Sequence, residues 1–424
     1  MPNLFLLILQ IGVILIAARI VGAVFRRLRQ PQVMGEMVAG ILLGPSLLGW
    51  LAPATSAALF PPSSLGYLNG LSQLGLVLFM FLVGLALNPK ELHDYGHAAV
   101  LTSHVSIVAP FTLAAGLSLF LYPQLSDQSV RFSSFALFMG AAMSITAFPV
   151  LARILTERGL LRTRMGTLAI ACAAVDDVTG WCILAYIVVL IRATSSSTPL
   201  WLTLGGSLAF VLLMIFGAKR LLRRFEKHFV KHHGLSENAI ALIILFVLAS
   251  ALATEALGIH LLFGAFLAGS IMPKNRAFVH EMLGKFEAVT VVLLLPLFFA
   301  FTGLRTSITL VRGAEMWGYC AVIIAVAIVG KLGGSLIAAR SAGMPWRDSA
   351  ALGILMNTRG LMELVILNIG LDIGVISPAL FSMMVLMALV TTFMTTPLLE
   401  WVYPVKRILS ETVAEEEKAE ALPA

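Results

Sequence analysis

The chain of 424 residues is 59% hydrophobic and only 12% charged, with a mean hydropathy of +0.95 and a formal net charge of +7. Soluble domains carry about twice that share of charged residues, so these values exclude a soluble globular protein. Apolar segments near the ~20 residues needed to cross a bilayer as a helix recur along the chain. The sequence therefore predicts an all-α polytopic membrane protein, because unpaired backbone groups cannot face lipid and the segments are too long for barrel strands.

Thirteen apolar spans follow one another in chain order. Two of them, 33–50 and 259–273, are short and rich in glycine, and two others, 132–157 and 349–371, are interrupted by polar residues. About 13 transmembrane helices are thus predicted, at 3–25, 33–50, 66–88, 97–122, 132–157, 164–191, 200–221, 237–257, 259–273, 285–305, 316–340, 349–371 and 377–402.

The basic residues indicate the orientation of these spans. Lys and Arg accumulate in cytoplasmic loops, and here nearly all of those in loops fall in alternate loops. The exceptions are Arg131, Arg192, Arg305 and Arg312. This pattern predicts an external N-terminus and a cytoplasmic C-terminus, most simply in a bacterial inner membrane. It also explains the positive charge as a topology signal, so no nucleic acid partner is expected.

The chain repeats itself weakly. LFMFLVGLALNP at 78–89 parallels LFFAFTGLRTSI at 297–308, with Gly84 on Gly303, and GAAMSITAFPVLARI at 140–154 parallels GILMNTRGLMELVIL at 353–367. AGILLGP at 39–45 resembles GAFLAGS at 264–270. Three matches in the same order predict two inverted six-helix repeats. They would occupy 1–195 and 233–403, joined by a linker span with its basic loop at 196–232 and followed by an acidic cytoplasmic tail at 404–424.

Two matched spans are predicted to be discontinuous. In SITAFP, Pro149 removes a backbone donor and leaves free polar groups near Ser144 to Thr146. In MNTRG, at 356–360, the residues Asn357 and Arg359 lie at membrane depth. Broken helices that pair across a repeat interface are typical of coupling-ion sites. Simple kinks are the alternative explanation.

Asp176 and Asp177 are adjacent acids inside an apolar run from about 167 to 189. An ionisable group in hydrocarbon costs at least ~2.5 kcal/mol, so each is a candidate functional residue. Neighbouring positions on a helix point ~100° apart, so the two carboxyl groups can face different surroundings. Two acids this close are not expected to ionise together. One of them could then bind a proton or a cation but not both, and that competition is a mechanism of exchange.

Other charged residues are candidates for supporting roles. Lys331, central in the span at 316–340, would either be deprotonated or need a carboxylate partner, for which Asp176 and Asp177 are the natural choices. Arg359 and Glu363 are spaced i, i+4 and can pair with each other, for structure or for gating. Polar residues that are candidates to line an ion funnel are Glu36 and Asn357.

Six stretches, in chain order, resemble the monovalent cation:proton antiporter-2 family: FLVGLALNPKEL, SITAFPVLARILTERG, AVDDVTGW, FGAFLAGSIMPK, LPLFFAFTGLR and ALGILMNTRGLMELVILNIG. This family includes bacterial sodium/proton and potassium/proton exchangers and the plant cation/proton exchangers. The resemblance runs from about residue 30 to 400, and its most specific parts are the paired aspartates and MNTRGLMEL.

The resemblance implies a sodium/proton antiporter fold in a homodimer, with a panel domain for dimerisation and a core domain for ion transport. The core helices would lie within 66–191 and 285–402, and the two broken helices would cross beside the ion site. Asp177 would be the main carrier of cation and proton, and Asp176 would pair with Lys331. Ser144 and Thr146 would offer oxygen ligands.

The chain departs from the potassium-efflux members of that family. Those members have a glutamine-aspartate pair in place of Asp176 and Asp177, and a nucleotide-binding regulatory domain follows their membrane part. An aspartate pair with a lysine resembles the electrogenic exchangers instead.

The sequence thus predicts a secondary active antiporter that exchanges Na⁺ or K⁺ for H⁺, with a role in cation and pH homeostasis. Its partners are expected to be monovalent cations, protons and the lipid bilayer, without a cofactor or a resident metal. A passive or ligand-gated cation channel is the alternative. An enzyme is not expected, because an intramembrane aspartyl protease takes its two acids from separate helices, and the choice between Na⁺ and K⁺ stays open.

Overall fold

The computed structural model describes residues 4–86, 96–127, 130–160, 163–195, 200–222, 236–258 and 260–404. Every regular element within these ranges is a helix, which confirms the predicted all-α class. The basic loop predicted at the end of the linker lies outside the described residues from 223 onward, and so does the acidic tail from 405 onward.

The described helices agree with the predicted spans in position. Eleven of them are long and apolar enough to cross a membrane, or up to 12 if a bent pair, Trp346–Met356 with Leu361–Asp372, counts as one span. The remaining predicted span, at 259–273, corresponds to the shorter apolar helix Leu261–Ile271. Thirteen crossings therefore stay a prediction.

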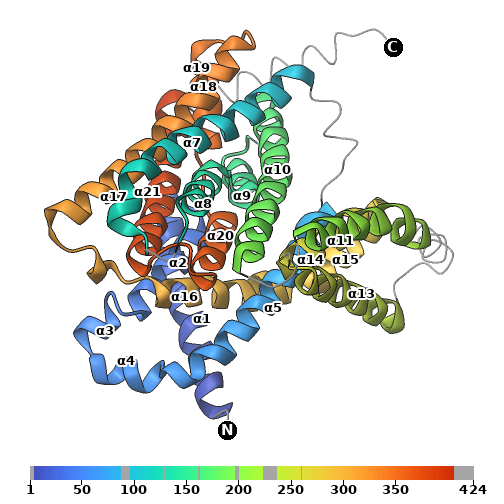
Figure 1. Ribbon diagram of the computed structural model, residues 1–424, viewed down its shortest axis with the longest axis horizontal. Coiled ribbons are helices and arrows are strands. Elements are labelled where there is room, and N and C mark those ends of the chain that lie inside the picture. The colour runs from blue at the N-terminus through green and yellow to red at the C-terminus, as the bar shows by residue number, and fades with distance from the viewer. Residues whose placement is uncertain are drawn as a thin grey trace.

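The helices form two bundles, which Figure 1 shows as a lower and an upper group. In the lower group, here called the panel bundle, the long helix α5 runs between α1 and α16 at one end and α14 at the other. The panel bundle consists of α1 (Leu4–Arg27), α2 (Gln32–Leu43), α3 (Leu48–Leu51), α4 (Pro53–Leu59), α5 (Pro62–Ala86), α13 (Glu237–Ala256), α14 (Leu261–Ile271), α15 (Arg276–Val289), the π-helical turn η2 (Thr290–Leu294) and α16 (Leu295–Arg305).

The upper group, here called the core bundle, contains both discontinuous helices. It consists of α7 (Gly96–Leu125), α8 (Phe132–Ser144), α9 (Phe148–Glu157), α10 (Arg164–Ser195), α17 (Gly313–Ile328), the π-helical turn η4 (Val329–Gly333), α18 (Gly334–Ser341), α19 (Trp346–Met356), α20 (Leu361–Asp372) and α21 (Pro378–Val402). Helix α11 (Leu200–Leu212) contacts α10 of the core bundle and continues into η1 (Leu213–Ala218), which contacts α14 of the panel bundle.

Glycines matched by the sequence repeat lie where panel helices touch. A Cβ atom at Gly84 of α5 would lie 2.2 Å from the carbonyl oxygen of Phe266 in α14. A Cβ atom at Gly303 of α16 would lie 2.3 Å from the carbonyl carbon of Gly40 in α2. Only glycine allows backbones to approach so closely. Each of these contacts joins one predicted repeat to the other, and the two correspond under the repeat alignment, as a pseudo-two-fold axis requires.

The membership of two helices differs from the core ranges implied by the family resemblance. Those ranges, 66–191 and 285–402, included the helices now seen as α5 and α16. In the structure α5 packs on α14 and α16 packs on α2, all within the panel bundle. The close glycine contacts explain this difference, because they let α5 and α16 pack tightly against panel helices.

Candidate functional site

The two discontinuous helices cross in the core bundle. Helix α8 ends at Ser144 and α9 begins at Phe148, while α19 ends at Met356 and α20 begins at Leu361. The two breaks are joined directly, because the backbone N–H of Ala147 donates to the carbonyl of Thr358 at 3.0 Å. Free backbone groups of one break are thus partly satisfied by the other, which is how a membrane protein tolerates irregular backbone.

Asp176 lies on α10 beside this crossing and is fully buried. Lys331 Nζ lies 2.6 Å from its Oδ2, so the predicted partner of the lysine is Asp176. The hydroxyl of Thr146, in the first break, lies 2.8 Å from the same oxygen. Two serines of α7 complete the set: Ser103 Oγ donates to Oδ1 at 2.6 Å, and Ser106 Oγ lies 2.9 Å from Oδ2.

Lys331 is held by three oxygens besides that carboxylate. Its ammonium group donates to the carbonyl of Ser106, to the hydroxyl of Ser106 and to the carbonyl of Ser144. The Ser144 carbonyl belongs to the last residue of α8, where a helix carries partial negative charge. The lysine therefore neutralises both Asp176 and one end of a broken helix.

Arg359, in the second break, also donates hydrogen bonds to the C-terminal end of α8. Its Nη1 donates to the carbonyl of Ala142 at 3.1 Å and to Glu363 Oε2 at 3.1 Å, and its Nη2 donates to the carbonyl of Met143. Arg359 and Glu363 are both buried, and their predicted i, i+4 pair is present. Cationic side chains from η4 and from the second break thus cap the C-terminus of α8.

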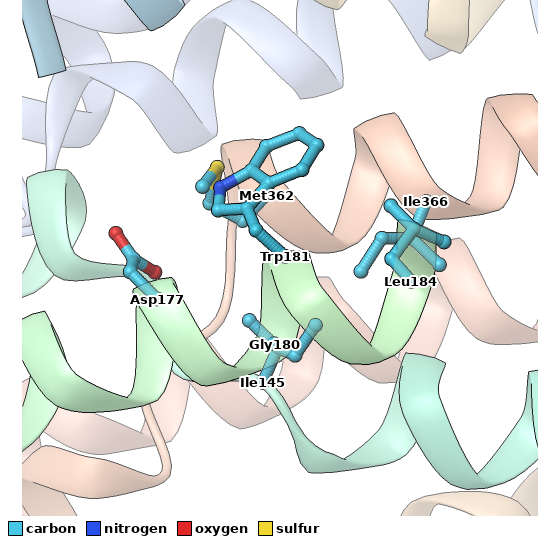
Figure 2. Close-up of a pocket in the computed structure, with 7 residues that line it drawn as sticks. All are labelled: Ile145, Asp177, Gly180, Trp181, Leu184, Met362 and Ile366. Atoms are coloured by element: carbon cyan, nitrogen blue, oxygen red, sulfur yellow. The ribbon is translucent and has the colours of Figure 1, made fainter. Parts of the chain in front are cut away.

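Asp177 is placed differently from its neighbour. It is 1% exposed, and neither of its carboxyl oxygens accepts a hydrogen bond from a described side chain. The backbone N–H of Phe148, at the positively polarised start of α9, faces it. Figure 2 shows Asp177 at one end of a pocket otherwise lined by Ile145, Gly180, Trp181, Leu184, Met362 and Ile366. Of the two acids, Asp177 is the one that has an open coordination shell.

The other predicted residues lie near the crossing but outside this pocket. Ser144 Oγ donates to the carbonyl of Ala141 in its own helix, and the Thr146 hydroxyl lies between Asp176 and the carbonyl of Met356. Their role as cation ligands therefore stays a prediction. Asn357 is buried, and its Oδ1 has no hydrogen-bond partner among the described residues.

Glu36 lies in the panel bundle rather than at the crossing. It is buried on α2, where it accepts a hydrogen bond from Gln32 Nε2 at 3.1 Å. It is not among the residues that line the Asp177 pocket. A role for Glu36 in a funnel stays a prediction.

Three residues of the site were not predicted from the sequence: Ser103, Ser106 and Trp181. The two serines are spaced i, i+3 in an apolar span, which places them on one helix face. That spacing was the available signal, but small hydroxyl residues are common in membrane helices and the spacing does not identify their partner. Trp181 follows Asp177 by one helical turn, within the same quoted motif.

The panel and core bundles are joined by polar contacts at both ends. At one end Arg305 of α16 reaches α20, with Nη2 2.6 Å from Asp372 Oδ1 and Nη1 3.0 Å from Asn368 Oδ1. At the other end Arg29, after α1, lies 3.3 Å from Glu400 of α21. Relative movement of the bundles must break these contacts.

The model of the family described as sodium/hydrogen exchanger, transmembrane, matches residues 13–401 of this chain. The chain belongs to the sodium/hydrogen exchanger family. Its predicted resemblance to cation:proton antiporters is thereby confirmed, and the discontinuous helices and the Asp176–Asp177 pair lie within the matched range.

Relatives of the exchanger family support this assignment. The Na(+)/H(+) antiporter NhaS4 of Synechocystis sp. is 45% identical over 95% of this chain and 98% of its own length. Cation/H(+) antiporter 17 of Arabidopsis thaliana is 44% identical, and K(+)/H(+) antiporter 1 of Saccharomyces cerevisiae is 34% identical. Alignments to these two cover 94% and 95% of this chain, which spans 48% and 47% of their lengths.

The fold agrees with that of a solved exchanger. The sodium proton antiporter MjNhaP1 from Methanocaldococcus jannaschii, solved at pH 8, matches with a TM-score of 0.67 over 94% of this chain and 96% of its own. The sequence identity is 15%, so the similarity concerns the fold alone. The predicted sodium/proton antiporter fold is confirmed.

Proposed function

We propose that this chain exchanges Na⁺ or K⁺ for H⁺ by competition at Asp177, and that movement of the core bundle against the panel bundle exposes Asp177 to each side of the membrane in turn. The observation that carries the proposal is the contrast between the two adjacent acids. Asp176 is fully engaged by Lys331 and three hydroxyl groups, whereas Asp177 is buried without a side-chain partner.

A single unpaired charge at this depth is expensive, and either a proton or a cation removes that cost. The carboxyl group of Asp177 cannot hold both, because protonation takes away the charge that attracts the cation. Asp176 does not offer a second cation site, since Lys331 already neutralises its charge. In one exchange cycle a cation and a proton therefore occupy Asp177 in turn.

Cation/proton antiport follows from membership of the sodium/hydrogen exchanger family. The identity of the cation belongs to the proposal. The Synechocystis relative is named for Na⁺ and the yeast relative for K⁺. Both cations bind oxygen ligands, and geometry rather than ligand type distinguishes them.

The setting of the transporter is also proposed. The alternation of basic loops supports an external N-terminus and a cytoplasmic C-terminus in a bacterial inner membrane. A homodimer through the panel bundle follows from the family resemblance. No cofactor is required, because the transported ions themselves drive the exchange.

The test uses the full chain in liposomes that contain a pH-sensitive dye. Adding Na⁺ or K⁺ should collapse an imposed pH gradient, and Asp177→Asn should abolish the response. Asp127→Asn, the same change at an exposed position, is the matched control and should exchange normally. Normal exchange by a folded Asp177→Asn variant would refute the proposal, and cation flux without proton movement would point to a channel.

A further inference from the structure

Trp181 covers Asp177 on the side of the pocket that leads toward the C-terminal end of α10. It follows Asp177 by four residues on one helix, so both side chains lie on the same face. In Figure 2 the indole ring lies between Asp177 and the pair Leu184 and Ile366. The ring therefore forms part of the pocket wall between Asp177 and that end.

The pocket is closed in this conformation. Its empty space amounts to about 160 Å³, and no part of that space is wide enough to hold a water molecule. Apart from Asp177, its lining residues are apolar side chains, one glycine and the indole of Trp181. Hydrophobic constrictions of this kind close an ion pathway by excluding water. Exchange at Asp177 therefore requires the lining to separate.

Trp181 is the lining residue that has an aromatic partner in the other bundle. Its ring stacks on Phe266 of α14, with centroids 6.4 Å apart and an interplanar angle of 21°. Trp181 belongs to the core bundle, and Phe266 belongs to the panel bundle. The backbone of Phe266 lies close to α5, because its carbonyl oxygen packs against Gly84. When the bundles move relative to each other, this ring contact must break.

The indole also carries an unused polar group. Trp181 is 4% exposed, and its Nε1 has no hydrogen-bond partner among the described residues. A buried indole N–H normally finds an acceptor. In this closed conformation the indole N–H therefore lacks the acceptor that such a group normally has.

We propose that Trp181 is a specificity-determining residue, which closes the pocket over Asp177 by stacking on Phe266 and makes monovalent cations pass its ring largely without water. This proposal rests on the proposed function. In a dry aromatic passage each cation must shed its hydration water before it binds, at a free-energy cost that differs between cations. The ring face offsets part of that cost by cation–π attraction. A wet passage would let each cation keep its water, and the differences between cations would shrink.

The experiment compares Trp181→Ala with Trp181→Phe in liposomes, with Trp317→Ala as the matched control. Trp317, on α17, is half exposed on the molecular surface, so its removal leaves the pocket intact. Two quantities are measured: the proton leak without any cation, and the ratio of KM values for Na⁺ and K⁺. Thermal unfolding in detergent shows which variants are folded.

We expect Trp181→Ala to raise the proton leak several-fold and to move the KM ratio toward one. Trp181→Phe keeps a ring and should resemble the wild type in both quantities, as should Trp317→Ala. The proposal is overturned if either quantity in folded Trp181→Ala equals the wild-type value, or if Trp181→Phe is as leaky as Trp181→Ala. Absence of exchange in the wild type would instead refute the proposed function.

Discussion

Lys331 Nζ lies 2.6 Å from Asp176 Oδ2, and neither side chain is exposed. This pair ties η4 to α10, and the hydroxyl groups of Ser103 and Ser106 tie the same carboxylate to α7. A buried pair with such complete hydrogen bonding is one rigid unit. It gives the core bundle a fixed frame beside the carboxyl group of Asp177.

Lys331→Gln should destabilise the protein, because it leaves Asp176 buried without its counter-charge. Removing one partner of a buried ion pair costs roughly 3–5 kcal/mol. The double variant Asp176→Asn with Lys331→Gln should recover part of this loss, since the two effects are coupled. Thermal unfolding in detergent measures both, and Lys285→Gln, at a surface pair, is the control.

The same variant tests whether the lysine carries a proton. We expect Lys331→Gln to keep some exchange while it moves less charge per cycle, measured as current across a supported membrane. Complete loss of exchange in a folded Lys331→Gln variant would make the lysine an obligatory carrier instead.

Ser106→Ala should weaken the frame around Asp176 more than Ser103→Ala does. The Ser106 hydroxyl lies within hydrogen-bond distance of both Asp176 oxygens and accepts from Lys331, whereas Ser103 Oγ contacts Oδ1 only. Loss of a hydrogen bond to a charged group costs about 1.5–3 kcal/mol. Ser118→Ala is the control on the same helix, because among the described residues Ser118 Oγ donates to the carbonyl of Ala114 and not to Asp176. Equal unfolding midpoints for Ser106→Ala and Ser118→Ala would contradict this account.

These serines mark the limit of what the sequence predicts. Hydropathy locates the helices because each one must be apolar enough to cross the bilayer, which is a property of its own residues. Pro149 and the MNTRG stretch predict the two breaks for the same reason, since both are local sequence features. Ser103 and Asp176 are separated by 73 residues, and only tertiary packing brings them together. The direction of the Thr146 hydroxyl, toward Asp176 rather than Asp177, likewise depends on how the two breaks cross.

The panel bundle shows the same limit. The alignment of Gly84 with Gly303 predicted a repeat, yet it did not indicate that each glycine packs against a helix of the other repeat. That arrangement places α5 and α16 in the panel bundle, although their residues fall within the ranges predicted for the core. The contact follows from shape complementarity between backbones, which a single sequence does not encode in any local pattern.

Arg359→Lys should destabilise the protein although it keeps the charge. The guanidinium group reaches two carbonyl groups of α8 and Glu363 at once, and a single ammonium group cannot reproduce that fork. Glu363→Gln should be milder, because Arg359 still caps α8. Thermal unfolding ranks the two variants, and a lower midpoint for Glu363→Gln than for Arg359→Lys would contradict the capping role.

Glu400→Gln should speed exchange when bundle movement limits the rate. Glu400 pairs with Arg29 of the panel side and with Arg158 at the end of α9. Exposed pairs of this kind are worth about 0.2–1 kcal/mol, which limits the gain in turnover to about fivefold. Initial rates of dye-detected exchange in liposomes measure it, and Glu281→Gln, at a pair within one helix, is the control. A slower Glu400→Gln variant with a normal unfolding midpoint would show that the contact assists transport.

Lys274 should make the stability of the panel bundle depend on pH. It lies between α14 and α15, and its Nζ donates to the carbonyls of Gly84 and Leu85 at 2.9 Å and to that of Gly269 at 3.2 Å. Burial, with a smaller effect of Lys219, lowers the pKa of Lys274 from 10.5 to about 7. Between pH 7 and pH 10.5 the unfolded chain therefore binds more protons at this group, so its contribution to the unfolding free energy rises with pH.

Lys274→Met removes that contribution and keeps a side chain of similar length. The unfolding midpoint of the wild type relative to Lys274→Met should increase from about pH 6 to about pH 9, because the folded lysine loses its charge in that interval. Lys285→Met, at a more exposed lysine, should show no such change relative to the wild type. A difference between wild type and Lys274→Met that is the same at both pH values would mean that Lys274 keeps its charge while it holds the ends of α5 and α14 together.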